Sequence, residues 1–319
     1  MLFRLFNNVW GSFLSLLLLL FVHSLIHPTL NTEVDFFVRI TGIGPTGLLF
    51  LRSLAIVVSI TLWSEAFRHR LLSEGNRFVG LVMTIAVLVF FNHFWIAKEI
   101  IVLILVALIF RRLMSSTDVL NPAPPMFEAG VLVAFSALLD ARFFLLLLPL
   151  ILGSLFLGRV NLRLLIVPLF GMLSTAWLLW GLVDVFGGDK GSLEWSRRLE
   201  ELQSVQQLVS ESIMLKPAHA LLIPAIWIAY LGFKMDWINS RAVERQILQT
   251  MFWSMLLFMI LIVLPFAGGR LWWTSAALPF SLLAAKTLGS WKRPWLREIF
   301  LLGLMCIPFL HLLFLSLLG

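Results

Sequence analysis

The sequence predicts an all-α protein, a polytopic bundle of about eleven transmembrane helices formed by residues 1–319 as a single domain. The first observation is composition: 60% of the 319 residues are hydrophobic and 13% are charged, with a mean hydropathy of +0.98. Soluble domains are about 45–50% apolar and about 25% charged. The second is a series of long apolar runs, and the third is a concentration of Lys and Arg in alternate loops. Together they exclude a soluble globular enzyme and a disordered chain.

The apolar runs set the predicted helices. A bilayer core of about 30 Å needs about 20 apolar residues per helix. The runs fall at 9–27, 44–64, 78–96, 97–110, 126–139, 143–157, 164–184, 218–233, 247–266, 271–286 and 298–318. The first is interpreted as an uncleaved transmembrane helix, because no small-residue cleavage site follows it. The three short runs from 97 to 157 predict short central helices, which usually line a cavity buried in protein.

Loop charges predict the orientation. If the helices alternate and the N-terminus is inside, most of the 24 Lys and Arg residues fall on the inner side. This is the positive-inside pattern, so we expect an N-in, C-out topology. The net charge of +7 is then a topology signal, and no nucleic-acid partner is expected. Many of the 13 Trp residues stand at predicted helix ends, which suits the headgroup level.

The sequence predicts local structure in two of the segments that connect the apolar runs. Residues 186–217 form the one long loop, predicted outside, and apolar residues such as Leu199, Leu202 and Val205 recur in it at helical spacing. We therefore expect an amphipathic helix on the outer interface, either a plain cover of the bundle or a lid over a site. The segment 121–125, Asn-Pro-Ala-Pro-Pro, predicts a rigid extended stretch on the inner side.

Ionisable residues gather near the outer face of this topology. Any one of them could be an ordinary loop charge, but Arg52 lies within the second run, where a guanidinium needs a partner or a wet cavity. Asp140 and Arg142 stand between two short helices, so their turn is expected below the headgroups. The outer candidates are Glu33, Asp35, Arg39, Asp140, Arg142 and Arg270. The six His residues show no metal-ligand spacing that names a third ligand.

The triplet Glu33-Val34-Asp35 in the first outer loop, directly after the first helix, resembles the GT-C superfamily of membrane glycosyltransferases, which use lipid-phosphate-linked sugars. The segment 128–159 also looks like the paired short helices in the middle of that fold. The resemblance implies that Asp35 or Glu33 is the catalytic base or a ligand of a divalent metal, Mg²⁺ or Mn²⁺. It also implies Arg39, Arg142 and Arg270 as candidates for the donor phosphate, with a polyprenyl-phosphate sugar as the lipid partner.

A longer resemblance, resting on residues 121–182, is to a family of multi-pass membrane proteins from Bacteroidota. It implies a location in the inner membrane of a diderm bacterium and carries no established activity. Three functions follow as hypotheses. The first is a glycosyltransferase working at the periplasmic face. The alternative is a non-enzymatic inner-membrane subunit of an envelope assembly or secretion complex. The third, a lipid transporter or flippase, ranks last because the sequence shows no inverted repeat.

Overall fold

The computed structural model describes residues 54, 57–63, 97–117, 121–157, 162–185, 226–231, 233–234, 241–264, 270–291, 293 and 295–299. Its helices are α6 (Ala97–Ser115), α7 (Ala123–Leu139), the 3₁₀ helix η2 (Ala141–Leu146), α8 (Leu147–Phe156), α9 (Leu162–Val185), α14 (Ala242–Val263) and α15 (Arg270–Ser290). Short stretches at 57–63, 226–231 and 295–299 are also helical. No strand occurs among these residues, so the all-α class is confirmed for the part described.

Within the described ranges, two helices are long and apolar enough to cross a membrane: residues Leu164–Leu182 of α9 and Ala242–Val263 of α14. The predicted pair of short helices in the middle of the chain is also present, as α7 and the continuous η2–α8 segment. The total of about eleven spans stays a prediction. The predicted amphipathic helix in 186–217 lies outside the described residues.

The expectation of an extended stretch at residues 121–125 is wrong. Helix α7 begins at Ala123 and takes Pro124 and Pro125 into its first turn. The physical reason is that the first N–H groups of a helix have no intrahelical acceptor, so proline loses nothing there, and its fixed φ already suits the helix. The side-chain oxygen of Asn121 accepts a hydrogen bond from the Ala123 N–H at 3.2 Å.

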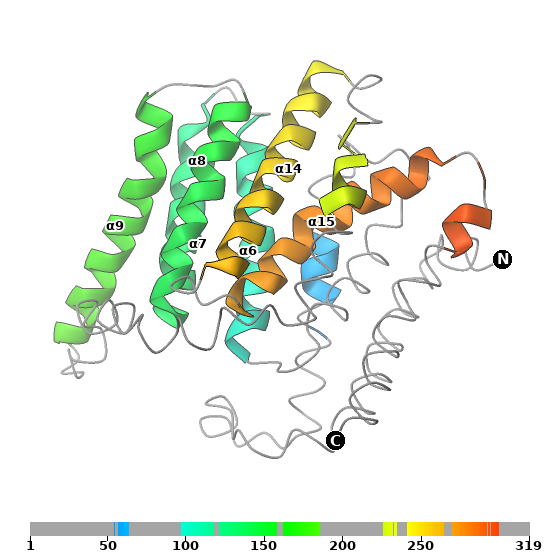
Figure 1. Ribbon diagram of the computed structural model, residues 1–319. Coiled ribbons are helices and arrows are strands. Elements are labelled where there is room, and N and C mark those ends of the chain that lie inside the picture. Colours follow the sequence, from blue (N-terminus) through cyan, green and yellow to red (C-terminus); the bar gives the residue numbers. More distant parts are fainter. Residues whose placement is uncertain are drawn as a thin grey trace, which may run out of the picture.

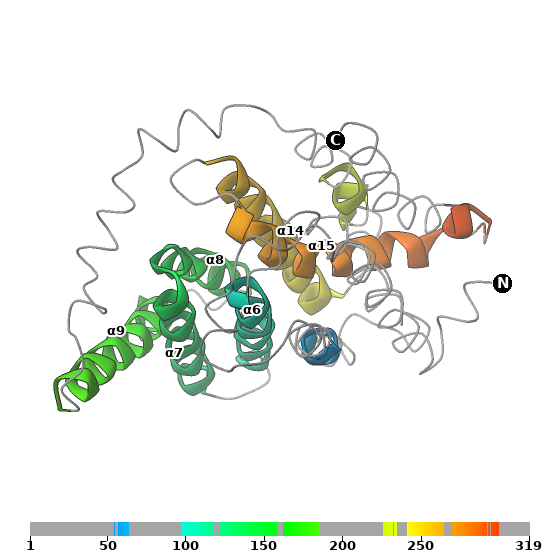
Figure 2. The same cartoon turned by 90° about the horizontal axis from the view of Figure 1, so that it is seen from below.

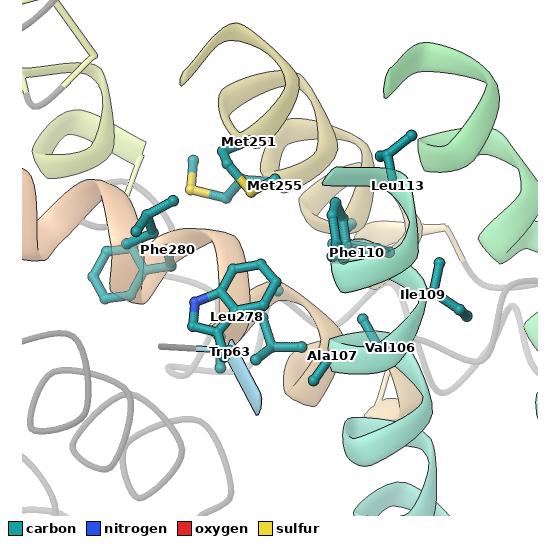
Figure 3. Close-up of a cluster of buried hydrophobic side chains, with 14 of the residues drawn as sticks. Trp63, Val106, Ala107, Ile109, Phe110, Leu113, Met251, Met255, Leu278 and Phe280 are labelled. Carbon is teal, nitrogen blue, oxygen red and sulfur yellow. The ribbon is translucent and has the colours of Figure 1, made fainter. Parts of the chain in front are cut away.

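The core forms where α8 and α15 pack against α14 and where α6 packs against α15 and α8 (Figures 1 and 2). Figure 3 shows its centre, where Met251 and Met255 of α14, Phe110 of α6 and Phe280 of α15 surround one apolar region together with Trp63. The Trp63 and Phe110 rings meet edge to face, with centroids 5.4 Å apart. Large aromatic side chains supply much of the buried apolar area of such a core.

The bundle has two ends, which we name by a residue at each. At the Arg112 end, Arg112 of α6 pairs with Glu128 of α7, and Gly153 of α8 lies against Leu113 and Thr250. At the Asp140 end, α7 finishes, η2 begins, α14 finishes and α15 begins. Helices α6, α7 and α8 therefore run in alternating directions, and α14 and α15 are antiparallel.

Helix α9 lies at the edge of the bundle, against α7 (Figures 1 and 2). Two glycines let the backbones approach closely. A Cβ on Gly130 would stand 2.0 Å from the Pro168 carbonyl oxygen, and one on Gly171 would stand 2.3 Å from the Phe127 oxygen. Small residues at such crossings are typical of helix pairs that pack within membranes.

Candidate functional site

The structure describes three of the predicted site residues. Asp140 and Arg142 lie at the Asp140 end, and Arg270 is the first residue of α15, although its side chain is not described. The predicted base or metal ligands Glu33 and Asp35 lie outside the described residues, as do Arg39 and Arg52.

Asp140 and Arg142 form a two-point ion pair. The Arg142 Nε donates to Asp140 Oδ1 at 3.0 Å, and Nη2 donates to Oδ2 at 3.3 Å. The Arg142 side chain is 31% exposed and the Asp140 side chain 14%. A guanidinium carries five N–H donors, and this pair uses two of them. The remaining donors can bind a second anion while the carboxylate keeps the guanidinium oriented.

The local sequence explains why the pair forms. Helix α7 ends at Leu139, and the Asp140 backbone is extended, with φ −156° and ψ 125°. Its side chain then caps η2 by accepting from the Arg142 backbone N–H at 3.0 Å. Capping of this kind is why Asp is favoured before a helix start. One carboxylate therefore holds both the backbone and the side chain of Arg142.

Aromatic contacts bring the start of α15 to the same end. The Phe143 ring of η2 meets the Trp272 ring of α15 at a centroid distance of 5.5 Å and 69°. Trp272 also stacks on Phe258 of α14 at 5.9 Å and 17°. All three side chains are fully buried. Because Arg270 precedes Trp272 by two residues, the α15 N-terminus and its positive helix dipole lie at the Asp140 end.

Among the described residues no group of three His, Cys, Asp or Glu side chains could hold a metal ion. The predicted Mg²⁺ or Mn²⁺ site depends on Glu33 and Asp35, so it stays a prediction. What the described residues offer at the Asp140 end is the Arg142 guanidinium, oriented by Asp140 and with donors left for an anion.

Sequence reasoning missed the contact between Arg112 and Glu128, whose atoms Nε and Oε2 lie 2.8 Å apart. Both side chains are 49% exposed, so the pair is a surface contact. The only sequence signal for this pair is the opposite charge of Arg112 and Glu128, which stand on either side of the short link between two predicted helices. The same reasoning did not find the buried hydroxyls of Ser254 and Ser275, which no motif marks.

No family model, curated protein or solved structure matches this chain. The resemblances to GT-C enzymes and to the Bacteroidota family accordingly stay predictions from the sequence.

Proposed function

We propose that this chain is an integral membrane protein, and helix α9 is the main support. Its span Leu164–Leu182 has 19 residues, which is about 28 Å at 1.5 Å per residue and close to the bilayer core. Only 17% of its most apolar stretch is buried inside the protein. Phe170, Trp177 and Leu178 are 62%, 73% and 65% exposed. Soluble monomers rarely expose a continuous apolar face of this extent, whereas lipid tails cover it at no cost.

The proposed setting is the inner membrane of a diderm bacterium, with several spans and the Asp140 end facing the periplasm. The orientation is supported by charge: Arg111, Arg112, Arg241 and Arg245 lie at the Arg112 end, where α6 finishes and α14 begins. Basic residues near span ends favour the cytoplasmic side.

At the Asp140 end we propose a glycosyltransferase that acts on a lipid-linked sugar, as the resemblance to GT-C enzymes implies. The observation that carries this proposal is the part-exposed Arg142 guanidinium, which Asp140 orients; Arg142 adjoins Phe143 in the chain, whose ring contacts Trp272 near the start of α15. A departing polyprenyl phosphate needs cationic stabilisation, and a guanidinium binds phosphate through two donors. The bond from the anomeric carbon to the phosphate oxygen breaks and a bond to an acceptor oxygen forms.

The acceptor proton needs a carboxylate within hydrogen-bond reach. Asp35 or Glu33 is proposed for this role, either directly or as a ligand of Mg²⁺ or Mn²⁺, which would add positive charge at the phosphate. Arg39, Arg52 and Arg270 are further proposed contacts to the donor, and Asp140 is the residue that orients Arg142.

The test uses purified full-length protein and a panel of radiolabelled polyprenyl-phosphate sugars, with and without Mg²⁺ or Mn²⁺. We expect release of the lipid phosphate by wild type and its loss in Glu33→Gln or Asp35→Asn. Arg142→Gln should lower turnover at least tenfold, and Arg112→Gln, a matched change at the other end, should not. Well-folded wild-type protein that consumes no donor would refute the proposal.

The second candidate is a non-enzymatic inner-membrane subunit of an envelope assembly or secretion complex. The exposed Trp177 and Trp180 rings, 6.0 Å apart on α9, favour it because such a face can receive a partner helix as well as lipid. Stoichiometric copurification of one protein, lost in Trp177→Ala, would support this candidate. The flippase hypothesis rests on Arg52, outside the described residues.

A further inference from the structure

Two serine hydroxyls are buried in the contact between α14 and α15. Ser254 and Ser275 have no exposed surface, and neither Oγ has a hydrogen-bond partner within the part of the chain that the structure describes. Other buried hydroxyls in these helices donate to a carbonyl of their own helix: Thr250 to Gln246, Ser281 to Leu278 and Thr287 to Leu283. Ser254 and Ser275 therefore differ from their neighbours, because their hydroxyls lack this bond.

The helix register places Ser254 and Ser275 at a similar height along α14 and α15. Phe258 of α14 stacks on Trp272 of α15, and the two helices are antiparallel. Ser254 precedes Phe258 by four residues, and Ser275 follows Trp272 by three. Residues at these spacings share a helix face. The spacing therefore places Ser254 and Ser275 about one turn further inside than the stacked rings, on the helix faces that carry Phe258 and Trp272.

A third polar group at this height along the two helices is the backbone carbonyl of Ser275. Pro279 lies within α15 and has no N–H, so the Ser275 carbonyl loses its α-helical donor. The flanking positions Met255, Ala276 and Leu278 are buried and apolar. Two hydroxyls and one carbonyl in such surroundings are costly unless they are hydrogen-bonded.

We propose that Ser254, Ser275 and the Ser275 carbonyl bind one buried water molecule that bridges α14 and α15. Buried waters typically make about three hydrogen bonds to otherwise unsatisfied groups, which is the number offered here. The groups are all neutral, which favours water over an ion. The bridge fixes the first two turns of α15, including Arg270, against α14. This inference is independent of the proposed function.

A double-mutant cycle on the full-length protein tests the bridge. Ser254→Ala, Ser275→Ala and the double variant are unfolded by titration with SDS. Each single change should lower the ratio of folded to unfolded protein about tenfold, because a water that loses one of its three partners is released and leaves the other hydroxyl unpaired. In the double variant the ratio of folded to unfolded protein should fall by a clearly smaller factor than the product of the two single effects, because both hydroxyls bind the same water. Additive losses, or single variants that are more stable than wild type, would overturn the proposal.

Ser281→Ala is the matched control. It is buried on the same helix, but its hydroxyl already donates to Leu278, so its effect should add to that of Ser254→Ala. A crystal structure near 2 Å resolution gives a readout that does not depend on folding of the variants. A density peak within hydrogen-bond distance of both Oγ atoms is expected. A direct bond between the two hydroxyls with no such peak would overturn the proposal.

Discussion

Replacing Gly130 by Ala should push α9 away from α7. A Cβ at this position would stand 2.0 Å from the Pro168 carbonyl oxygen and 2.7 Å from its carbonyl carbon. Both atoms belong to backbone, so no side-chain rotation can relieve the clash. Ordinary contact begins at 3.4 Å, which means that one helix must move by the difference, 1.4 Å.

The cost follows from the packing that this shift disturbs. Overpacking a well-packed contact costs about 1–3 kcal/mol. A displacement of whole helices lies at the upper end of that range, so we expect a loss of about 3 kcal/mol in the free energy of unfolding. Gly171→Ala should cost a similar amount, because its Cβ would stand 2.3 Å from the Phe127 oxygen. The two losses should not add fully, since one shift makes room for both methyl groups.

The assay is SDS-titrated unfolding of the purified protein, followed by circular dichroism. Gly181→Ala is the matched control, since it lies in the same helix α9 and its Cβ would meet nothing within 4 Å. Alanine is the better helix former by about 1 kcal/mol, so this control should be neutral or slightly stabilising. If Gly130→Ala were as stable as Gly181→Ala, the close approach of α7 and α9 would be wrong.

Three further predictions concern single contacts. Arg112→Gln or Glu128→Gln should change the free energy of unfolding by at most about 1 kcal/mol, since the pair is half exposed; a loss above 2 kcal/mol by SDS titration would contradict this. Phe143→Ala should cost about 3–5 kcal/mol, since a fully buried ring against Trp272 is removed; a loss under 1 kcal/mol would refute that contact. Leu173→Arg, at the centre of the span Leu164–Leu182, should lower membrane insertion in a glycosylation-reporter assay, by about 3 kcal/mol in apparent insertion free energy; unchanged insertion would mean that α9 does not face lipid.

The sequence alone predicts the central helices well. The apolar runs 126–139 and 143–157 coincide with α7 and η2–α8, and the polar turn between them holds Asp140 and Arg142. These features are local, because a carboxylate two residues before an arginine can cap the turn and pair with its side chain. The structure differs from the prediction at the proline-rich start of α7, because proline favours an extended chain and a first helical turn alike.

Apolar patterning does not distinguish a buried helix from an exposed one. Helix α15 is buried at every position from Ser275 to Ala285, whereas α9 exposes Trp177 and Leu178. Lipid tails and a protein core are both apolar, so a lipid-facing helix and a central helix have similar sequences. The contact of Gly130 with Pro168 joins residues far apart in the chain, and spacing along one sequence contains no signal for it.

Binding of polyprenyl phosphate tests the proposed donor site at the Asp140 end most directly. Affinities are measured for wild type, Arg142→Gln and Arg112→Gln in lipid nanodiscs. We expect Arg142→Gln to weaken binding at least tenfold, because one charge-assisted bidentate contact is lost, and Arg112→Gln to bind as wild type does. Equal affinities for Arg142→Gln and wild type would contradict a phosphate site at the Asp140 end.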